Sequence, residues 1–373
     1  MSNILTFPNV SVGFDPTSRP CGFGALAECV LRHRHPKHNA YWLKENAEIL
    51  NVLASIPSCV SGPVRTDVLG VYQQTYADLF EELKFFPQYY RFYLSMLLDL
   101  EKLGFEGDLG QKAVEFVVAH NLVETELSDL QRAEGARLIA RRGIHGWQDD
   151  LVARLIRFAA RSETFAVPNK KACYELTHIV FYLTDYGRVP FILADDVELS
   201  LIFSGLFAFL DEDADLLAEV CLSLMFIGKD VPEIWQHWLR AQRLQFQVEY
   251  GTAPSQIDAY HTFLMVEWDA LSSGAEEPVL DLRPAPMQFF APRKHANLIT
   301  HVSLYLLNLS GKRTGNWDRD RSHIFDRLTP MGTALLEQAI LSTPHFEAFY
   351  EGFARADVSS ESVLLGGMGG ADV

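Results

Sequence analysis

The stretch ELTHIVFYLTDYG, Glu175–Gly187, combines a helical hydrophobic pattern with polar groups that are costly to bury. Its apolar residues recur at spacings of three and four. The run stops at a glycine, the residue that most readily adopts the left-handed conformation just past a helix end. A second stretch, ITHVSLYLLNLSG, Ile299–Gly311, repeats the arrangement. Both stretches predict buried α-helices that end at a glycine.

The same spacing of apolar residues continues through most of the chain. There is very little of the alternation between apolar and polar residues that is typical of strands. Examples of the helical pattern are YWLKENAEILNVL, VYQQTYADLFEEL, YYRFYLSMLLDLEKLG and QKAVEFVVAHNLV. We therefore expect an all-α protein.

Glycines close behind the predicted helices recur about every 40 residues, a spacing that fits a repeated helical hairpin. They are Gly62, Gly104, Gly143, Gly187, Gly228, Gly274, Gly311 and Gly352. The helices that lead to them are mostly very apolar, whereas intervening ones such as ETELSDLQRAEGARLIARR and WQDDLVARLIRFAARS carry charged faces. Because an inner helix of a closed ring is surrounded by protein, this alternation favours an α/α toroid with the charged helices outside. The alternative is an open α-solenoid.

The 373 residues are enough for one large domain built by repetition. We expect residues 21–356 to form this single α/α-repeat domain. Residues 1–20 are predicted to be a flexible N-terminal segment, and residues 357–373 a disordered tail with too little apolar surface to order itself.

Composition narrows the range of partners and compartments. A formal charge of −16 argues against nucleic acid, because affinity for phosphate backbones comes largely from Lys and Arg. The longest apolar runs, LSLIFSGLFAFL and LLAEVCLSLMFI, are shorter than the roughly 20 residues that span a bilayer, so we expect no membrane association. The N-terminus lacks the pattern of a signal peptide, and the five cysteines show no CxxC spacing. These features predict a cytoplasmic protein.

The two opening stretches align His178, Tyr182 and Asp185 with His301, Tyr305 and Asn308. Positions i, i+4 and i+7 share one face of an α-helix, so each stretch presents a stripe of polar groups. A helix between them, YHTFLMVEWDALSSG, places His261 similarly, with Asp269 eight residues further on. If these are inner helices of a ring, the three stripes face a common cavity.

Histidine beside a carboxylate can transfer protons near neutral pH. We therefore predict a cavity that binds or acts on a small organic or peptide substrate. His178 paired with Asp185, and His301, are the candidate catalytic residues. The candidate substrate contacts are Tyr182, His261, Asp269, Tyr305 and Asn308. The alternative from another class is a non-catalytic helical scaffold for a protein partner, in which the same polar groups only hydrogen-bond between hairpins.

The sequence identifies neither a metal nor a cofactor. Imidazoles and carboxylates can ligate a divalent metal, but no HExxH or comparable short spacing is present. The acidic segment DEDAD, Asp211–Asp215, lies between two predicted helices, where aspartate is favoured as an N-cap. No GxGxxG, Walker loop or GxSxG occurs, so nucleotide binding and serine hydrolysis have no support.

The segment LTHIVFYLTDYG, Leu176–Gly187, resembles the pattern LTHxxFYxTDxG found in uncharacterised bacterial all-helical proteins. This resemblance implies no activity. Apolar helices that end at glycines are also distantly similar to α/α toroids such as the terpenoid cyclases and the lanthionine cyclases. The acidic signatures of the former and the Cys and His zinc ligands of the latter are missing, so neither reaction is implied.

Overall fold

The fold is taken from a computed structural model that describes residues 22–355 apart from 38, 58, 60–62, 252–257, 276–277, 295 and 310–312. For residues 63–66 and 149 it describes the backbone only. The segments 1–20 and 357–373, predicted to be flexible and disordered, lie outside the described residues.

The described chain is almost entirely helical, which confirms the prediction of an all-α protein. The first helices are α1 (Gly22–Cys29), the π-helix η1 (Val30–Arg34), α2 (Ala40–Ser55), α4 (Pro63–Phe85), the 3-10 helix η2 (Pro87–Tyr89), α5 (Tyr90–Leu103), α6 (Leu109–Ala119), α7 (Asp129–Ala140) and α8 (Asp149–Ala159). The next are α9 (Ser162–Ala166), α10 (Lys170–Leu183), α11 (Asp195–Leu210), α12 (Ala214–Phe226), α13 (Glu233–Arg243) and α14 (Tyr260–Ser272). The last are α15 (Leu298–Leu309), α16 (Trp317–Phe325), α17 (Pro330–Ser342) and α18 (Phe346–Ala354).

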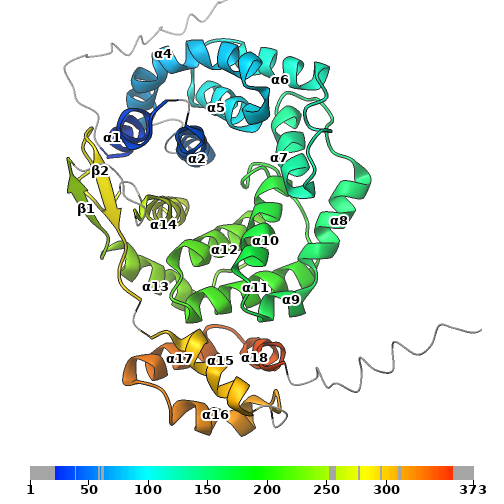
Figure 1. Ribbon diagram of the computed structural model, residues 1–373, viewed down its shortest axis with the longest axis vertical. Coiled ribbons are helices and arrows are strands. Elements are labelled where there is room, and N and C mark those ends of the chain that lie inside the picture. The colour runs from blue at the N-terminus through cyan, green and yellow to red at the C-terminus, as the bar shows by residue number, and fades with distance from the viewer. Residues whose placement is uncertain are drawn as a thin grey trace, which may run out of the picture.

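The helices from α1 to α14 follow a curve in Figure 1, with α2, α5, α12 and α14 nearer its middle and α4, α6, α8 and α13 at its edge. Packing follows this order, since α2 and α4 pack on α5, α7 and α12 pack on α10, and α14 packs on α12. The apolar runs of the sequence are buried by these contacts. Helix α12, for example, buries nearly every residue from Ala214 to Leu224.

Two polar links join the first helices to α14 and the segments that flank it. Trp268 Nε1 donates a hydrogen bond to Ser55 Oγ at 3.1 Å. Arg34, whose side chain is 3% exposed, binds Glu45 at 2.7 Å and Asp258 at 2.9 Å. More than two hundred residues of chain therefore separate segments that are in direct contact.

Glycines end the helices much as the sequence predicts. Gly104, Gly143, Gly187, Gly228 and Gly274 follow α5, α7, α10, α12 and α14, and each has a positive φ. Behind α5, for example, the Gly104 N–H donates to the carbonyl of Leu100 at 3.1 Å, closing the last turn. The prediction does not hold for Gly352, which lies inside α18. Gly62 and Gly311 lie outside the described residues.

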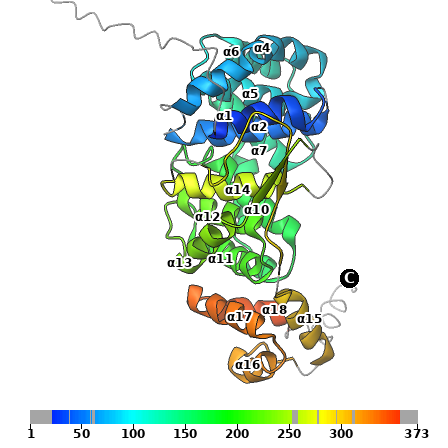
Figure 2. The same cartoon turned by 90° about the vertical axis from the view of Figure 1, so that its left-hand side faces the viewer.

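Helices α15–α18 form a separate group at one end of the molecule (Figures 1 and 2). They pack on α9, α11 and α13. Phe349 of α18 meets Phe203 of α11 with ring centroids 5.8 Å apart. This packing explains why α11 is apolar all round: α12 covers one side of it and the C-terminal helices cover another.

A two-stranded sheet accompanies the helices. Strands β1 (Gln247–Tyr250) and β2 (Met287–Phe290) pair antiparallel, with Gln247 opposite Phe290. Strands of four residues are too short to produce a clear alternation in the sequence. The inner residues of β2 pack on α14, where Phe289 stacks on Phe263 with centroids 4.8 Å apart.

Candidate functional site

A cavity of about 240 Å³ lies between α2, α5, α7, α10, α12 and α14. Each of these helices contributes at least one charged or titratable side chain to its wall. The set comprises Lys44, Glu48, Arg91, Glu134, Arg137, His178, Glu219 and His261. Aromatic rings from the same helices and from the turn after α10 complete the wall: Phe92, Phe181, Tyr182, Tyr186 and Trp268.

His178 is held by its own helix and faces a buried carboxylate. Its Nδ1 lies 2.7 Å from the backbone carbonyl of Tyr174, one turn earlier on α10. A carbonyl only accepts hydrogen bonds, so Nδ1 carries a proton, and in the neutral ring Nε2 carries the lone pair. Glu219 Oε2 lies 3.9 Å from Nδ1 and accepts a hydrogen bond from Thr177 Oγ1 at 2.6 Å.

His261 is enclosed by carboxylates. Its Nδ1 lies 2.9 Å from Asp215 Oδ1, and its Nε2 lies 3.7 Å from Glu48 Oε1. The second oxygen of Asp215 accepts a hydrogen bond from the hydroxyl of Tyr174 at 2.7 Å. Tyr174 therefore connects the two histidines, because its carbonyl orients His178 and its hydroxyl holds the carboxylate that orients His261.

The charges of this cluster depend on one another. Burial alone would lower the pKa of His261, but Glu48 and Asp215 outweigh it and raise the pKa to about 10. Burial opposes ionisation of Asp215, yet His261 keeps its pKa below the usual range. Burial raises the pKa of Glu219 above its ordinary value. His261 is therefore a cation at neutral pH, paired with the ionised Asp215.

Local sequence explains why the two carboxylates lie together. Asp213 caps α12, since its side chain accepts a hydrogen bond from the Leu216 N–H at 3.3 Å. The predicted capping role of the DEDAD segment is thus confirmed at Asp213. Asp215 and Glu219 follow in the first two turns and are four residues apart, which places them on one face of α12. That face is turned toward α10 and α14.

The turn after α10 has an unusual backbone. Asp185, Tyr186 and Gly187 have φ values of 44°, 57° and 76°. Positive φ is uncommon for any residue other than glycine and more so for a bulky one such as tyrosine. Arg137 secures the turn, because its guanidinium lies 4.7 Å from the Tyr186 ring centroid and binds Asp185 Oδ1 at 2.8 Å. The turn thereby places the Tyr186 ring in the cavity wall.

The structure brings three of the sequence-predicted residues together, since His178, Tyr182 and His261 all line the cavity. Asp185 does not pair with His178 as we expected. It binds Arg137 and, at 3.3 Å, Arg188, because the chain has already left the helix at this residue.

Asp269 does not line the cavity, although it follows His261 by eight residues and so lies near the same side of α14. Its side chain is buried, its Oδ1 has no hydrogen-bond partner, and burial raises its pKa to about 7. The cavity wall is formed instead by His261, Met265 and Trp268, at spacings of four and three residues along the helix.

The three residues predicted on the second stretch are elsewhere. His301, Tyr305 and Asn308 belong to α15 in the C-terminal group, and none of them lines the cavity. His301 and Asn308 are exposed, and the Tyr305 ring lies 4.8 Å from the Arg327 guanidinium. The expectation that α15 is an inner helix fails because a hydrophobic pattern does not specify the surface on which a helix packs.

Sequence reasoning missed Glu48, Asp215 and Glu219. One signal was available: Glu219 is the only charged residue of the otherwise apolar run LLAEVCLSLMFI. A lone carboxylate in such a run must find a partner when it is buried. Its partners come from α10, so no pattern within α12 identifies them.

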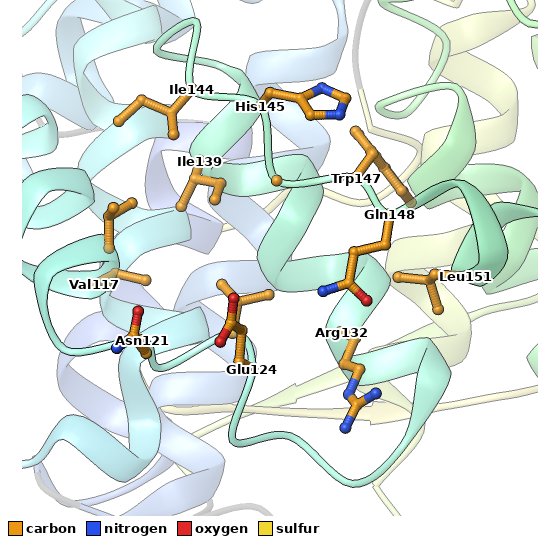
Figure 3. Close-up of a pocket in the computed structure, with 13 residues that line it drawn as sticks. Val117, Asn121, Glu124, Arg132, Ile139, Ile144, His145, Trp147, Gln148 and Leu151 are labelled. Atoms are coloured by element: carbon orange, nitrogen blue, oxygen red, sulfur yellow. The ribbon is translucent and has the colours of Figure 1, made fainter.

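A second hollow, of about 290 Å³, lies between α6, α7 and α8 (Figure 3). The figure shows Val117, Ile139, Ile144 and Leu151 around it, with Glu124 and Arg132 among the polar groups. None of the sequence-predicted residues lines this hollow. It also lacks the histidine–carboxylate contacts found between α10, α12 and α14, so we place the candidate site in the cavity of His178 and His261.

The residues that the structure describes hold neither a cluster suited to a metal ion nor a membrane-spanning helix. Within them, no group of three or more His, Cys, Asp or Glu side chains is arranged to hold a metal ion. Over the same residues, no helix combines the length and the apolar character needed to cross a membrane.

Fold and site together define an all-α protein with a cavity lined by histidines and carboxylates. The chain belongs to the family described as Domain of unknown function (DUF6902), whose model matches residues 1–356. Neither a search of curated proteins nor one of solved structures found a match.

Proposed function

We propose that α1–α14 form a closed α/α toroid whose inner helices are α2, α5, α7, α10, α12 and α14. Each of these helices lines the cavity, and outer helices such as α4, α6, α8, α11 and α13 alternate with them along the chain. The links from Arg34 to Asp258 and from Ser55 to Trp268 support closure. In an open solenoid each repeat contacts only its neighbours, so the first and last repeats do not bind each other.

Within this cavity, the two histidines form an acid–base pair that acts on a small organic or peptide substrate. The observation that carries the proposal is the convergence of His178–Glu219 and His261–Asp215 on one wall. His261 holds a proton that its Nε2 can donate, whereas Nε2 of His178 can accept one when that ring is neutral. A proton removed from the substrate by His178 is thus balanced by one that His261 supplies.

The size and charge of the cavity suit a small polar ligand. Its volume of about 240 Å³ lies just below the usual range for drug-sized ligands, so it fits a small molecule or one end of a peptide. Lys44, Arg91 and Arg137 can bind anionic groups. Glu48, Glu134 and Glu219 can bind cationic ones, and aromatic rings cover apolar parts. We therefore expect a substrate that carries polar or charged groups at both ends.

The proposal is tested by screening amino acids, dipeptides and small organic acids by ligand-observed NMR. Each compound that binds is then followed in D₂O for exchange of its hydrogens or conversion to a product. Binding or turnover should be lost in His178→Ala and His261→Asn, whereas His237→Ala, on the exposed side of α13, should behave as wild type. If compounds bind equally well to all three variants, the two histidines are not part of the site.

A second candidate is a protein-binding scaffold, which the C-terminal helices favour. Leu304 and Leu307 of α15 are 53% and 68% exposed, and Leu341 of α17 is 76% exposed. Contiguous exposed apolar patches are typical of protein interfaces, and these leucines would contribute to one. This candidate predicts that His178→Ala leaves partner binding unchanged, while Leu307→Ser weakens it.

A further inference from the structure

A third hollow, of about 470 Å³, lies at the C-terminal ends of α5 and α7, behind the Asp185–Gly187 turn. Four cationic side chains line it: Lys102, Arg141, Arg142 and Arg188. Glu101 and Asp185 are the carboxylates in its wall. It lies beside the histidine cavity but is separate from it. Arg137 lines the cavity, Asp185 lines the hollow, and their ion pair lies between the two.

The cations of this hollow outnumber the carboxylates close to them. Lys102, Arg141, Arg142 and Arg188 are four cations, whereas Asp99, Glu101 and Asp185 are three carboxylates. Cations near a helix C-terminus are favoured by the helix dipole, which accounts for Arg141 and Lys102. That explanation does not extend to Arg188, which lies in the loop beyond α10. The excess of positive charge is notable in a chain of net charge −16.

Arg188 is bonded less well than its neighbours. Its Nη1 donates to Oδ1 and to the carbonyl of Asp185 at 3.3 Å each, and its Nη2 donates to Oδ1 and to the carbonyl of Asn51 at 3.4 and 3.5 Å. Its buried Nε has no partner among the described residues. Arg141 and Arg137 bind carboxylates at the shorter distances of 2.7 and 2.8 Å, although Nε of Arg137 also lacks a partner among the described residues. Because long hydrogen bonds are weak, the terminal nitrogens of Arg188 can exchange them for shorter ones to an additional acceptor.

The electrostatic surroundings of Arg188 agree with its geometry. Burial, together with Arg141 and Arg137, lowers the pKa of Arg188 from its ordinary value despite Asp99 and Asp185. Burial is the largest of these effects, so the guanidinium loses more solvation than its carboxylate neighbours make up for. An anion bound in the hollow would offset this lost solvation and accept hydrogen bonds from the guanidinium.

We propose that this hollow binds a phosphate group, held by Arg188 with Arg141, Arg142 and Lys102. Guanidinium groups match the geometry of phosphate oxygens and bind them through paired hydrogen bonds, while a lysine adds a point charge. The group belongs either to free inorganic phosphate or to a small phosphate monoester. The proposal is independent of the acid–base role of His178 and His261.

The experiment is isothermal titration calorimetry of the full chain with inorganic phosphate and, separately, with glycerol phosphate, at low and moderate salt. We expect millimolar or tighter binding of at least one ligand, weaker at higher salt because the contacts are ionic. Arg188→Gln should weaken binding about tenfold or more, as loss of a charge-assisted hydrogen bond does. Lys102→Gln, at an exposed position, should weaken it about two- to fivefold.

Lys112→Gln is the matched control, because Lys112 is 50% exposed, lies on α6 and does not line the hollow. It should bind phosphate as wild type does, and so should His261→Asn. The proposal is overturned if neither ligand binds at millimolar concentration, or if Lys102→Gln binds as tightly as wild type. The Lys102 variant keeps the test decisive even if Arg188→Gln fails to fold.

Discussion

At the scale of single residues, the site depends on side chains whose partners come from other helices. The spacing of polar groups on helical stripes was sufficient to select His178, Tyr182 and His261, which line one cavity. It was not sufficient to find Asp215 or Glu219, because their contacts cross from α12 to α10 and α14. Such contacts depend on how helices pack, and no periodicity within one helix contains that information.

The protonation of His261 makes the stability of the protein depend on pH. A pKa raised in the folded state stabilises the fold fully below the unfolded value of about 6.5, and this contribution is lost as pH rises through the folded value. For His261 that value is about 10. Solvent screening reduces this contribution, because the side chain is 36% exposed.

We therefore predict that the contribution of His261 to the free energy of unfolding declines between about pH 6.5 and about pH 10. Urea denaturation at several pH values measures it. His261→Asn should flatten the curve in this window, whereas His237→Asn, on an exposed part of α13, should leave it unchanged. Parallel curves for wild type and His261→Asn would show that the carboxylates do not hold the proton on His261.

At the scale of elements, hydrophobic periodicity and terminal glycines predict where the helices lie. They predict less well which elements each helix packs against. Five glycines do end helices with positive φ. Helix α7, which we expected outside because its face is charged, lines the cavity through Glu134 and Arg137. The very apolar α15 lies in the C-terminal group. Charge on a helix therefore indicates contact with either solvent or a polar cavity, and apolar character indicates burial without saying where.

Two of these glycines form a matched pair for mutation. Gly143 and Gly187 have φ values of 75° and 76°, but a Cβ added at Gly187 would lie 2.5 Å from the Phe226 ring, whereas one at Gly143 would meet nothing within 4 Å. Gly143→Ala should cost about 1 kcal/mol of backbone strain. Gly187→Ala should cost that and about 1 to 3 kcal/mol more for overpacking. Thermal denaturation measures both, and equal losses would contradict the packing shown at Gly187.

At the scale of the whole molecule, the all-α class follows from the sequence. Which distant segments of the chain contact each other does not. Arg34 illustrates the difference. In the sequence it belongs to the basic segment RHRHPKH, which looks like a solvated loop. In the structure it is buried, binds Glu45 and Asp258, and lies 4.2 Å from the Tyr260 ring centroid. Charge alone does not distinguish an exposed arginine from one that joins two ends of a fold.

Arg34→Met should destabilise the protein by about 3 to 5 kcal/mol, because it leaves two buried carboxylates without their cation. Arg32→Met is the control, since Arg32 is 56% exposed and its pair with Glu28 should contribute less than about 1 kcal/mol. Hydrogen exchange should show lost protection in α2 and also around α14 and β2. Loss confined to α2 would contradict closure between the first helices and α14.

The central claim is that His178 and His261 form one site with the carboxylates of α12. Nitrogen-15 NMR of the histidine rings across a pH titration tests it most directly. We predict that His261 stays doubly protonated through neutral pH and titrates at about 10, and that Asp215→Asn lowers its pKa. Asp211→Asn, which removes the same charge four residues earlier, should not. The account would be contradicted if His261 titrates near the ordinary pKa of about 6.5 and Asp215→Asn leaves that pKa unchanged.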